Sequence, residues 1–154
     1  LLILILPYSA VVMENIRYGR LDATDEEVKA AAKAVHADEV AEKLDKGYDS
    51  DVGEGGDRLS TGEKQLISFA RIVLKNPSIV ILDEATSSID TETEILIKEA
   101  LDIMLKDKTA FMVAHRLSTI RNADRILYIA NKGIAESGTH EELMKLKGLY
   151  YQLN

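Results

Sequence analysis

Residues 78–83, with the sequence Ser-Ile-Val-Ile-Leu-Asp, form an unbroken apolar run that ends in a carboxylate, and Glu84 follows directly. An apolar run without alternating polar residues is typical of a strand that is covered on both faces, as parallel strands are. The segments after this run alternate between helical and extended patterns, which favours an α/β parallel sheet. Ligands of such sheets bind at the carboxyl ends of the strands, so Asp83 and Glu84 are expected at a binding edge.

Two adjacent carboxylates at that edge suit phosphoryl transfer. A first carboxylate can hold the water shell of Mg²⁺, while a second can orient or deprotonate an attacking water. The alternative interpretation is structural, because acids after a strand also cap the following turn. The pattern by itself leaves both interpretations open.

A capped helix precedes this strand. Ser60 and Glu63 have the spacing of a capping box, and the apolar positions that follow predict a helix that runs to about Lys75, before Pro77. Residues 59–65, Leu-Ser-Thr-Gly-Glu-Lys-Gln, therefore bring a hydroxyl, a glycine and backbone amides together at a helix N-terminus. Such a terminus is suited to binding an anion.

The other elements follow from the same signals. Thr24 and Glu27 predict a second capped helix, and residues 7–19 are expected to be irregular. The remaining expected elements are short helices near 38–44 and at 117–122, a long helix at 92–106, strands at 109–114, 125–129 and 134–136, and a last helix capped by Thr139 and Glu142. We divide the chain into a core strand with a helical subdomain at 1–75, and the rest of the core at 76–154.

Composition excludes several classes of function. The chain has 19 basic and 26 acidic residues, a net charge of −7 and no basic cluster, which disfavours nucleic-acid binding. The absence of cysteine excludes disulfides and thiolate metal sites, and three scattered histidines leave little for zinc. The apolar run at 1–6 is far shorter than the roughly 20 residues of a membrane span and is expected to be a buried strand. Because the chain opens on this run without methionine, we expect that an upstream segment is missing.

Four segments in one order resemble the ATPase domain of ABC transporters. Residues 59–65, 79–84, 85–90 and 114–118 are similar in turn to the signature, Walker B, D-loop and H-loop motifs of that family, with similar spacing. Residues 50–56 resemble the X-loop of multidrug and lipid exporters, which faces the coupling helices of the transmembrane domain. The resemblance implies part of a P-loop NTPase (RecA-like) parallel sheet with an α-helical signature subdomain, which couples ATP hydrolysis to export at the cytoplasmic face of a membrane.

The same resemblance implies roles for individual residues. Glu84 would be the general base, His115 the switch that contacts the γ-phosphate, and Asp83 the ligand of Mg²⁺. Asp90 would lie at the interface with a second nucleotide-binding domain. The signature residues that would meet ATP held by that second domain are Ser60, Thr61, Gly62 and Glu63.

The chain also departs from the family pattern. No GxxxxGK[ST] sequence occurs in it, so the P-loop that cradles the β and γ phosphates is absent. Thr61 stands where glycine is usual, Glu63 stands where glutamine is common, and the expected Q-loop position falls on Ile3. We therefore expect the isolated chain to be inactive.

The sequence has two alternative functional interpretations. One is a chromosome-maintenance or DNA-repair ATPase of the ABC superfamily, which carries a long coiled coil before its signature half. The acidic composition and the absence of heptads disfavour it. The other is a non-catalytic fragment that folds but binds no nucleotide.

Overall fold

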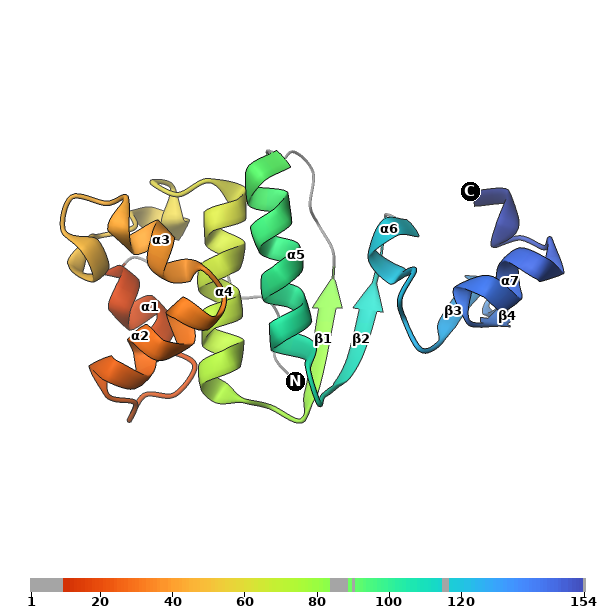
Figure 1. Cartoon of the computed structure of the whole chain (residues 1–154), viewed down its shortest axis with the longest axis horizontal. Helices are drawn as coiled ribbons and strands as arrows, with labels where there is room; N and C mark the ends of the chain where they lie inside the picture. Colours follow the sequence, from red (N-terminus) through yellow and green to blue (C-terminus); the bar gives the residue numbers. More distant parts are fainter. Residues whose placement is uncertain (1–9, 84–88, 90, 115–116, 154) are drawn as a thin grey trace. The chain divides into compact units, whose positions relative to one another are not determined.

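The computed structural model describes residues 10–83, 89, 91–114 and 117–153 (Figure 1). They fall into two compact units. The first unit contains the described residues up to Leu82 and those from 89 to 111. The second unit contains Asp83 and the described residues from Met112 onwards. The predicted division after Lys75 concerns functional parts and stays a prediction.

The first unit is mainly helical. It contains α1 (Val12–Arg17), α2 (Asp25–Ala34), α3 (Ala37–Glu42), the 3₁₀ turns η1 (Gly47–Asp49) and η2 (Glu54–Gly56), α4 (Thr61–Lys75) and α5 (Thr91–Leu105). Helix α4 packs against α1, α2 and α3, and it also packs against α5 (Figure 1). The predicted capping box of α2 is confirmed, with the Thr24 amide donating to Glu27 at 2.9 Å. This bond, together with one from Arg20, lowers the pKa of Glu27.

Helix α1 corrects the expectation that residues 7–19 are irregular. It has only six residues, and the side chain of its N-cap, Val11, makes no capping hydrogen bond. No local signal therefore marks its start. Burial stabilises the helix instead, because Val12 and Ile16 are fully buried and Met13 is nearly so.

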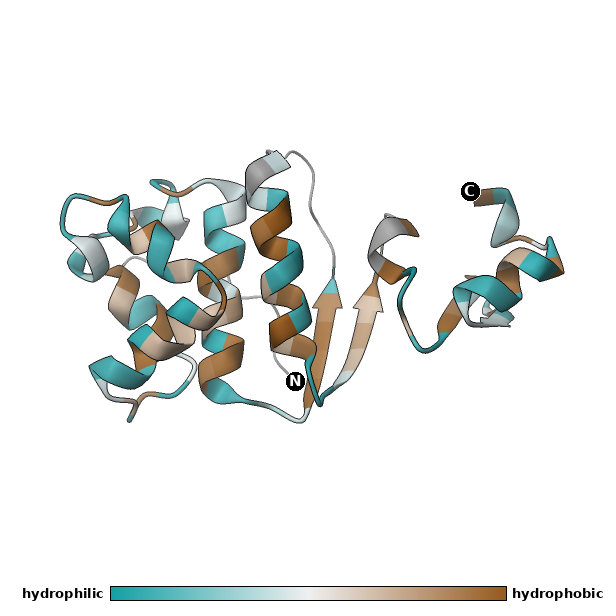
Figure 2. Ribbon diagram, viewed as in Figure 1, coloured by the Kyte–Doolittle hydropathy of each residue, from teal (hydrophilic) through white to brown (hydrophobic). Residues whose placement is uncertain are grey.

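Strands β1 (Ile79–Asp83) and β2 (Thr109–Val113) are neighbours in a two-stranded sheet, and they run in the same direction (Figure 1). Both are predominantly hydrophobic (Figure 2). Burial alternates along β1, since Val80 and Leu82 are buried whereas Ile79 is 50% exposed. Phe111 on β2 is 57% exposed. The parallel pair agrees with the sequence, but in the described residues only one face of the sheet is well covered.

The second unit contains α6 (Leu117–Ile120), β3 (Ile126–Ala130), β4 (Gly133–Gly138), α7 (His140–Leu146) and η3 (Tyr151–Leu153). Strands β3 and β4 form an antiparallel hairpin, which the expectation of a parallel sheet did not include. Asn131 and Lys132 connect them with φ of 51° and 64°, as a two-residue type I′ turn requires. In the described part of the chain, no helix is long and apolar enough to cross a membrane.

Candidate functional site

The carboxyl end of β1 presents Asp83 to solvent. The strand is anchored by Val80 and Leu82, which are buried, while Asp83 is its last residue and is exposed. The described residues contain no group of three or more metal-binding side chains. A single exposed carboxylate suits a hard cation that keeps several waters and takes its other ligands from a nucleotide, as Mg²⁺ does. Glu84, Asp90 and His115 lie outside the described residues, so their roles stay predictions.

The N-terminus of α4 begins as predicted. Ser60 is its N-cap, and the Ser60 amide donates to Glu63 Oε2 at 2.8 Å. In return, the Glu63 amide donates to Ser60 Oγ at 3.3 Å. This reciprocal pair is the capping box that the sequence predicts, and it fixes the start of the 15-residue helix.

The first turn of α4 has the chemistry of an anion site that faces outwards. The amides of Thr61 and Gly62 are at positions where a helix supplies no carbonyl four residues earlier. The helix dipole places positive potential at the same end. Ser60 and Thr61 are exposed, so a phosphate from another molecule can approach them. The carboxylate of Glu63 is engaged by the Ser60 amide, although its charge still opposes an anion.

Gly62 is buried, unlike the two residues before it. A Cβ atom built on Gly62 would lie 2.2 Å from Cγ2 of Thr93 and 3.4 Å from Cγ2 of Ile89. Contacts under 3.0 Å are essentially never seen for real Cβ atoms, so a larger residue fits here only if the Thr93 side chain moves. The sequence predicts a ligand contact for Gly62 but contains no signal for this packing role.

The glycine-rich stretch before the signature is tightly turned and attached to the start of α1. The Val12 amide donates to the Ser50 carbonyl at 3.0 Å, and the Val52 amide donates to the Ala10 carbonyl at 3.2 Å. Gly53 has φ of 79°, and its amide donates to the carboxylate of Asp51 at 2.8 Å. The backbone from 50 to 53 is thus held against the helical unit.

The signature helix α4 contains a buried arginine. Arg71 on α4 is only 3% exposed, and its Nη2 donates to Asn15 Oδ1 at 2.6 Å. Its Nε donates to the main-chain oxygen of Asn15. Asn15 is itself fully buried, and its Nδ2 donates to the carbonyls of Ala10 and Val11. This cluster was not predicted from the sequence, where its one signal is a basic residue inside the apolar stripe of α4.

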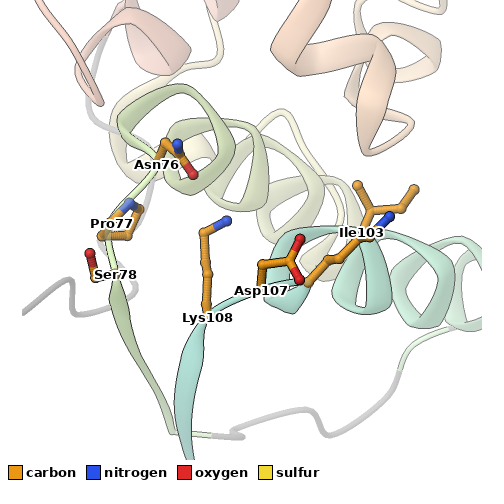
Figure 3. Close-up of a pocket in the computed structure, with 7 residues that line it drawn as sticks. Asn76, Pro77, Ser78, Ile103, Asp107 and Lys108 are labelled. Atoms are coloured by element: carbon orange, nitrogen blue, oxygen red, sulfur yellow. The ribbon is translucent and has the colours of Figure 1, made fainter.

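A hollow of about 430 Å³ lies at the amino ends of β1 and β2 (Figure 3). It is lined by Asn76, Pro77, Ser78, Ile103, Lys106, Asp107 and Lys108. Ser78 precedes β1, whereas Asp83 ends it, so the hollow is at the opposite end of the strand from Asp83. Because ligands of parallel α/β sheets bind at the carboxyl ends, we do not assign the hollow to the candidate site.

Comparison with known proteins gives consistent matches. Residues 6–87 match the family described as ABC transporter. The uncharacterized ABC transporter ATP-binding protein YknV of Bacillus subtilis is 54% identical over 143 residues, which cover 93% of this chain and 24% of that protein. A putative multidrug export ATP-binding/permease protein of Staphylococcus aureus is 54% identical over 146 residues, which cover 95% of this chain and 25% of that protein.

A solved structure is also similar. It is described as a bacterial Atm1-family ABC exporter with ATP bound, and it is 40% identical with a TM-score of 0.86. The match covers 96% of this chain and 26% of the exporter chain. The predicted α/β fold, part of a P-loop NTPase sheet with a helical signature subdomain, is thereby confirmed. The chain spans about a quarter of the length of these relatives, all of which carry transporter names.

Proposed function

Because this chain belongs to the ABC transporter family, we propose that it supplies part of the ATP-hydrolysing domain of an exporter. The observation that carries the proposal is the pairing of two features that ATP hydrolysis by such domains needs. One is the exposed Asp83 at the carboxyl end of β1, and the other is the helix N-terminus at which Ser60 and Thr61 are exposed. The exporter names of the relatives support the direction of transport.

Asp83 is proposed to bind Mg²⁺. Its exposed carboxylate fits a cation that is shared with nucleotide phosphates and water. When bound, the ion would neutralise charge that develops on the transferred phosphoryl group. Glu84 would accept a proton from the attacking water, and His115 would contact the γ-phosphate and hold the base in place. These two roles come from the resemblance.

The signature is proposed to act on ATP held by a second nucleotide-binding domain. The exposed side chains of Ser60 and Thr61, with the amide of Gly62, would meet the γ-phosphate from the side opposite its own P-loop. Glu63 would hold this turn in place through its bond to the Ser60 amide. Asp90 would contact the same partner domain. Hydrolysis would then need two domains, identical or different.

A transmembrane domain is the second proposed partner. The turn at Asp51 to Gly56 is fixed to α1 by the bonds of Val12 and Val52, so a force applied at this turn can reach the helical unit. By its resemblance to the X-loop, it would face the coupling helices. The chain would accordingly work at the cytoplasmic face of a membrane.

A chimaera tests the proposed function. Residues 10–154 replace the matching segment of the full-length Staphylococcus aureus relative, and ATP hydrolysis is measured in membrane vesicles beside the unaltered host. We expect hydrolysis comparable with that of the host, because the host supplies the P-loop and the transmembrane domain. A chimaera that folds and binds ATP but does not hydrolyse it would contradict the proposal.

The isolated chain is expected to show no saturable ATP binding. It contains no P-loop sequence, and the amides and lysine of that loop are what cradle the phosphates. Titration calorimetry of the 154-residue chain with ATP and Mg²⁺ measures this directly. A micromolar dissociation constant would show that the chain holds nucleotide without a P-loop.

A further inference from the structure

The methyl group of Thr93 occupies the space in which a side chain at position 62 would lie. A Cβ on Gly62 would be 2.2 Å from Cγ2 and 3.3 Å from Cβ of Thr93. The contact joins the first turn of α4 to the first turn of α5, two helices that pack together along their lengths (Figure 1). The methyl group therefore sits in a notch that exists only because residue 62 is glycine.

Thr93 is the first member of the face that α5 turns towards its neighbours. Ile97, Ala100 and Met104 follow at helical spacing, and the last two are fully buried. Ile89, just before the helix, also approaches the notch, with its Cγ2 3.4 Å from the Cβ position of Gly62. Ile89 and Thr93 therefore both border the space beside Gly62.

We propose that Thr93 is a positioning residue that fixes the signature turn at Ser60 to Gly62 relative to α5. The inference rests on the proposed function, in which the amide of Gly62 and the residue Asp90 both serve ATP at a dimer interface. Close-packed contacts transmit displacement instead of absorbing it. Since a misplacement of about 1 Å at a reacting group can cost a hundredfold in rate, this contact would govern turnover without touching the nucleotide.

The test, made in the chimaera, adds a methyl group at position 62 and removes one at position 93. Gly62→Ala is expected to lower kcat by about tenfold or more, with KM for ATP little changed, because the P-loop that binds ATP is elsewhere. Thr93→Ser removes Cγ2 and keeps the hydroxyl group, so the double variant Gly62→Ala/Thr93→Ser should recover most of the lost kcat. Gly133→Ala is the matched control, since a Cβ there meets nothing within 4 Å.

Turnover is counted per bound nucleotide, so that unfolded protein does not contribute. A purely structural role would reduce the folded fraction and leave this number unchanged, which would overturn the proposal. It would also be overturned if the double variant stayed as slow as Gly62→Ala, because the added methyl would then act on the ligand side. If the starting chimaera hydrolyses no ATP, the proposed function fails, and the positioning role fails with it.

Discussion

ATP turnover is expected to fall by about two decades or more when Glu84 is replaced by glutamine in the chimaera. Glutamine keeps the size of the side chain but cannot accept a proton from the attacking water. Nucleotide should still bind, because the change leaves intact the groups that are proposed to hold the phosphates, which are a P-loop in the host and Mg²⁺. Steady-state hydrolysis and equilibrium ATP binding, measured on one preparation, separate the two effects.

Two further variants distinguish the loss of a base from other effects of removing a carboxylate. Asp83→Asn should instead weaken Mg²⁺-dependent nucleotide binding, because it removes the charge proposed to hold the ion. Glu141→Gln makes the same chemical change at an exposed position in the first turn of α7 and should leave turnover unaltered. Near-normal hydrolysis by Glu84→Gln would remove Glu84 from the role of base.

The helix starts could be predicted from the sequence because their signals are local. The side chains of Thr24, Ser60 and Thr139 each accept a hydrogen bond from the amide three residues later. That later residue is a glutamate in each case, and its carboxylate accepts a hydrogen bond from the amide of the cap residue. Such boxes involve four consecutive residues and depend little on the rest of the fold. The starts of α2, α4 and α7 could therefore be predicted from their capping boxes.

Features that depend on distant residues could not be predicted in this way. Arg71 and Asn15 are 56 positions apart, and their bond stabilises a short helix that has no cap of its own. The contact of Gly62 with Thr93 likewise joins two helices between which β1 lies along the chain. Propensity and periodicity describe each segment alone and contain no information about which segments meet.

The same distinction between local and distant information applies to the residues of the candidate site. The sequence predicted the place of Asp83 through the strand pattern and that of Ser60 through the capping box, and the structure agrees with both. The chemical roles of Glu84, Asp90 and His115 come from resemblance, because a role depends on what lies opposite a side chain in an assembled dimer.

Asn15→Leu is expected to lower the free energy of unfolding by about 3 kcal/mol. Leucine has a similar size but offers no acceptor to the Arg71 guanidinium, which is 3% exposed and bonded to Asn15 Oδ1 at 2.6 Å. It also removes the bonds from Nδ2 to the carbonyls of Ala10 and Val11. Urea unfolding of the 154-residue chain, followed by circular dichroism, gives the difference. Asn122→Leu, at an exposed position, should change stability by no more than about 0.5 kcal/mol.

A double-mutant cycle decides whether the loss comes from the buried charge or from the shape of the site. Arg71→Met removes the cation, so Asn15→Leu/Arg71→Met places two apolar side chains where a charged group was bonded. Replacing both partners of a buried polar pair costs less than removing one, because no charge is left with an acceptor missing. The double variant should therefore be more stable than the sum of the single losses implies, by about 1 kcal/mol or more. Strict additivity would mean that the Asn15 side chain and the Arg71 guanidinium stabilise α1 and α4 independently.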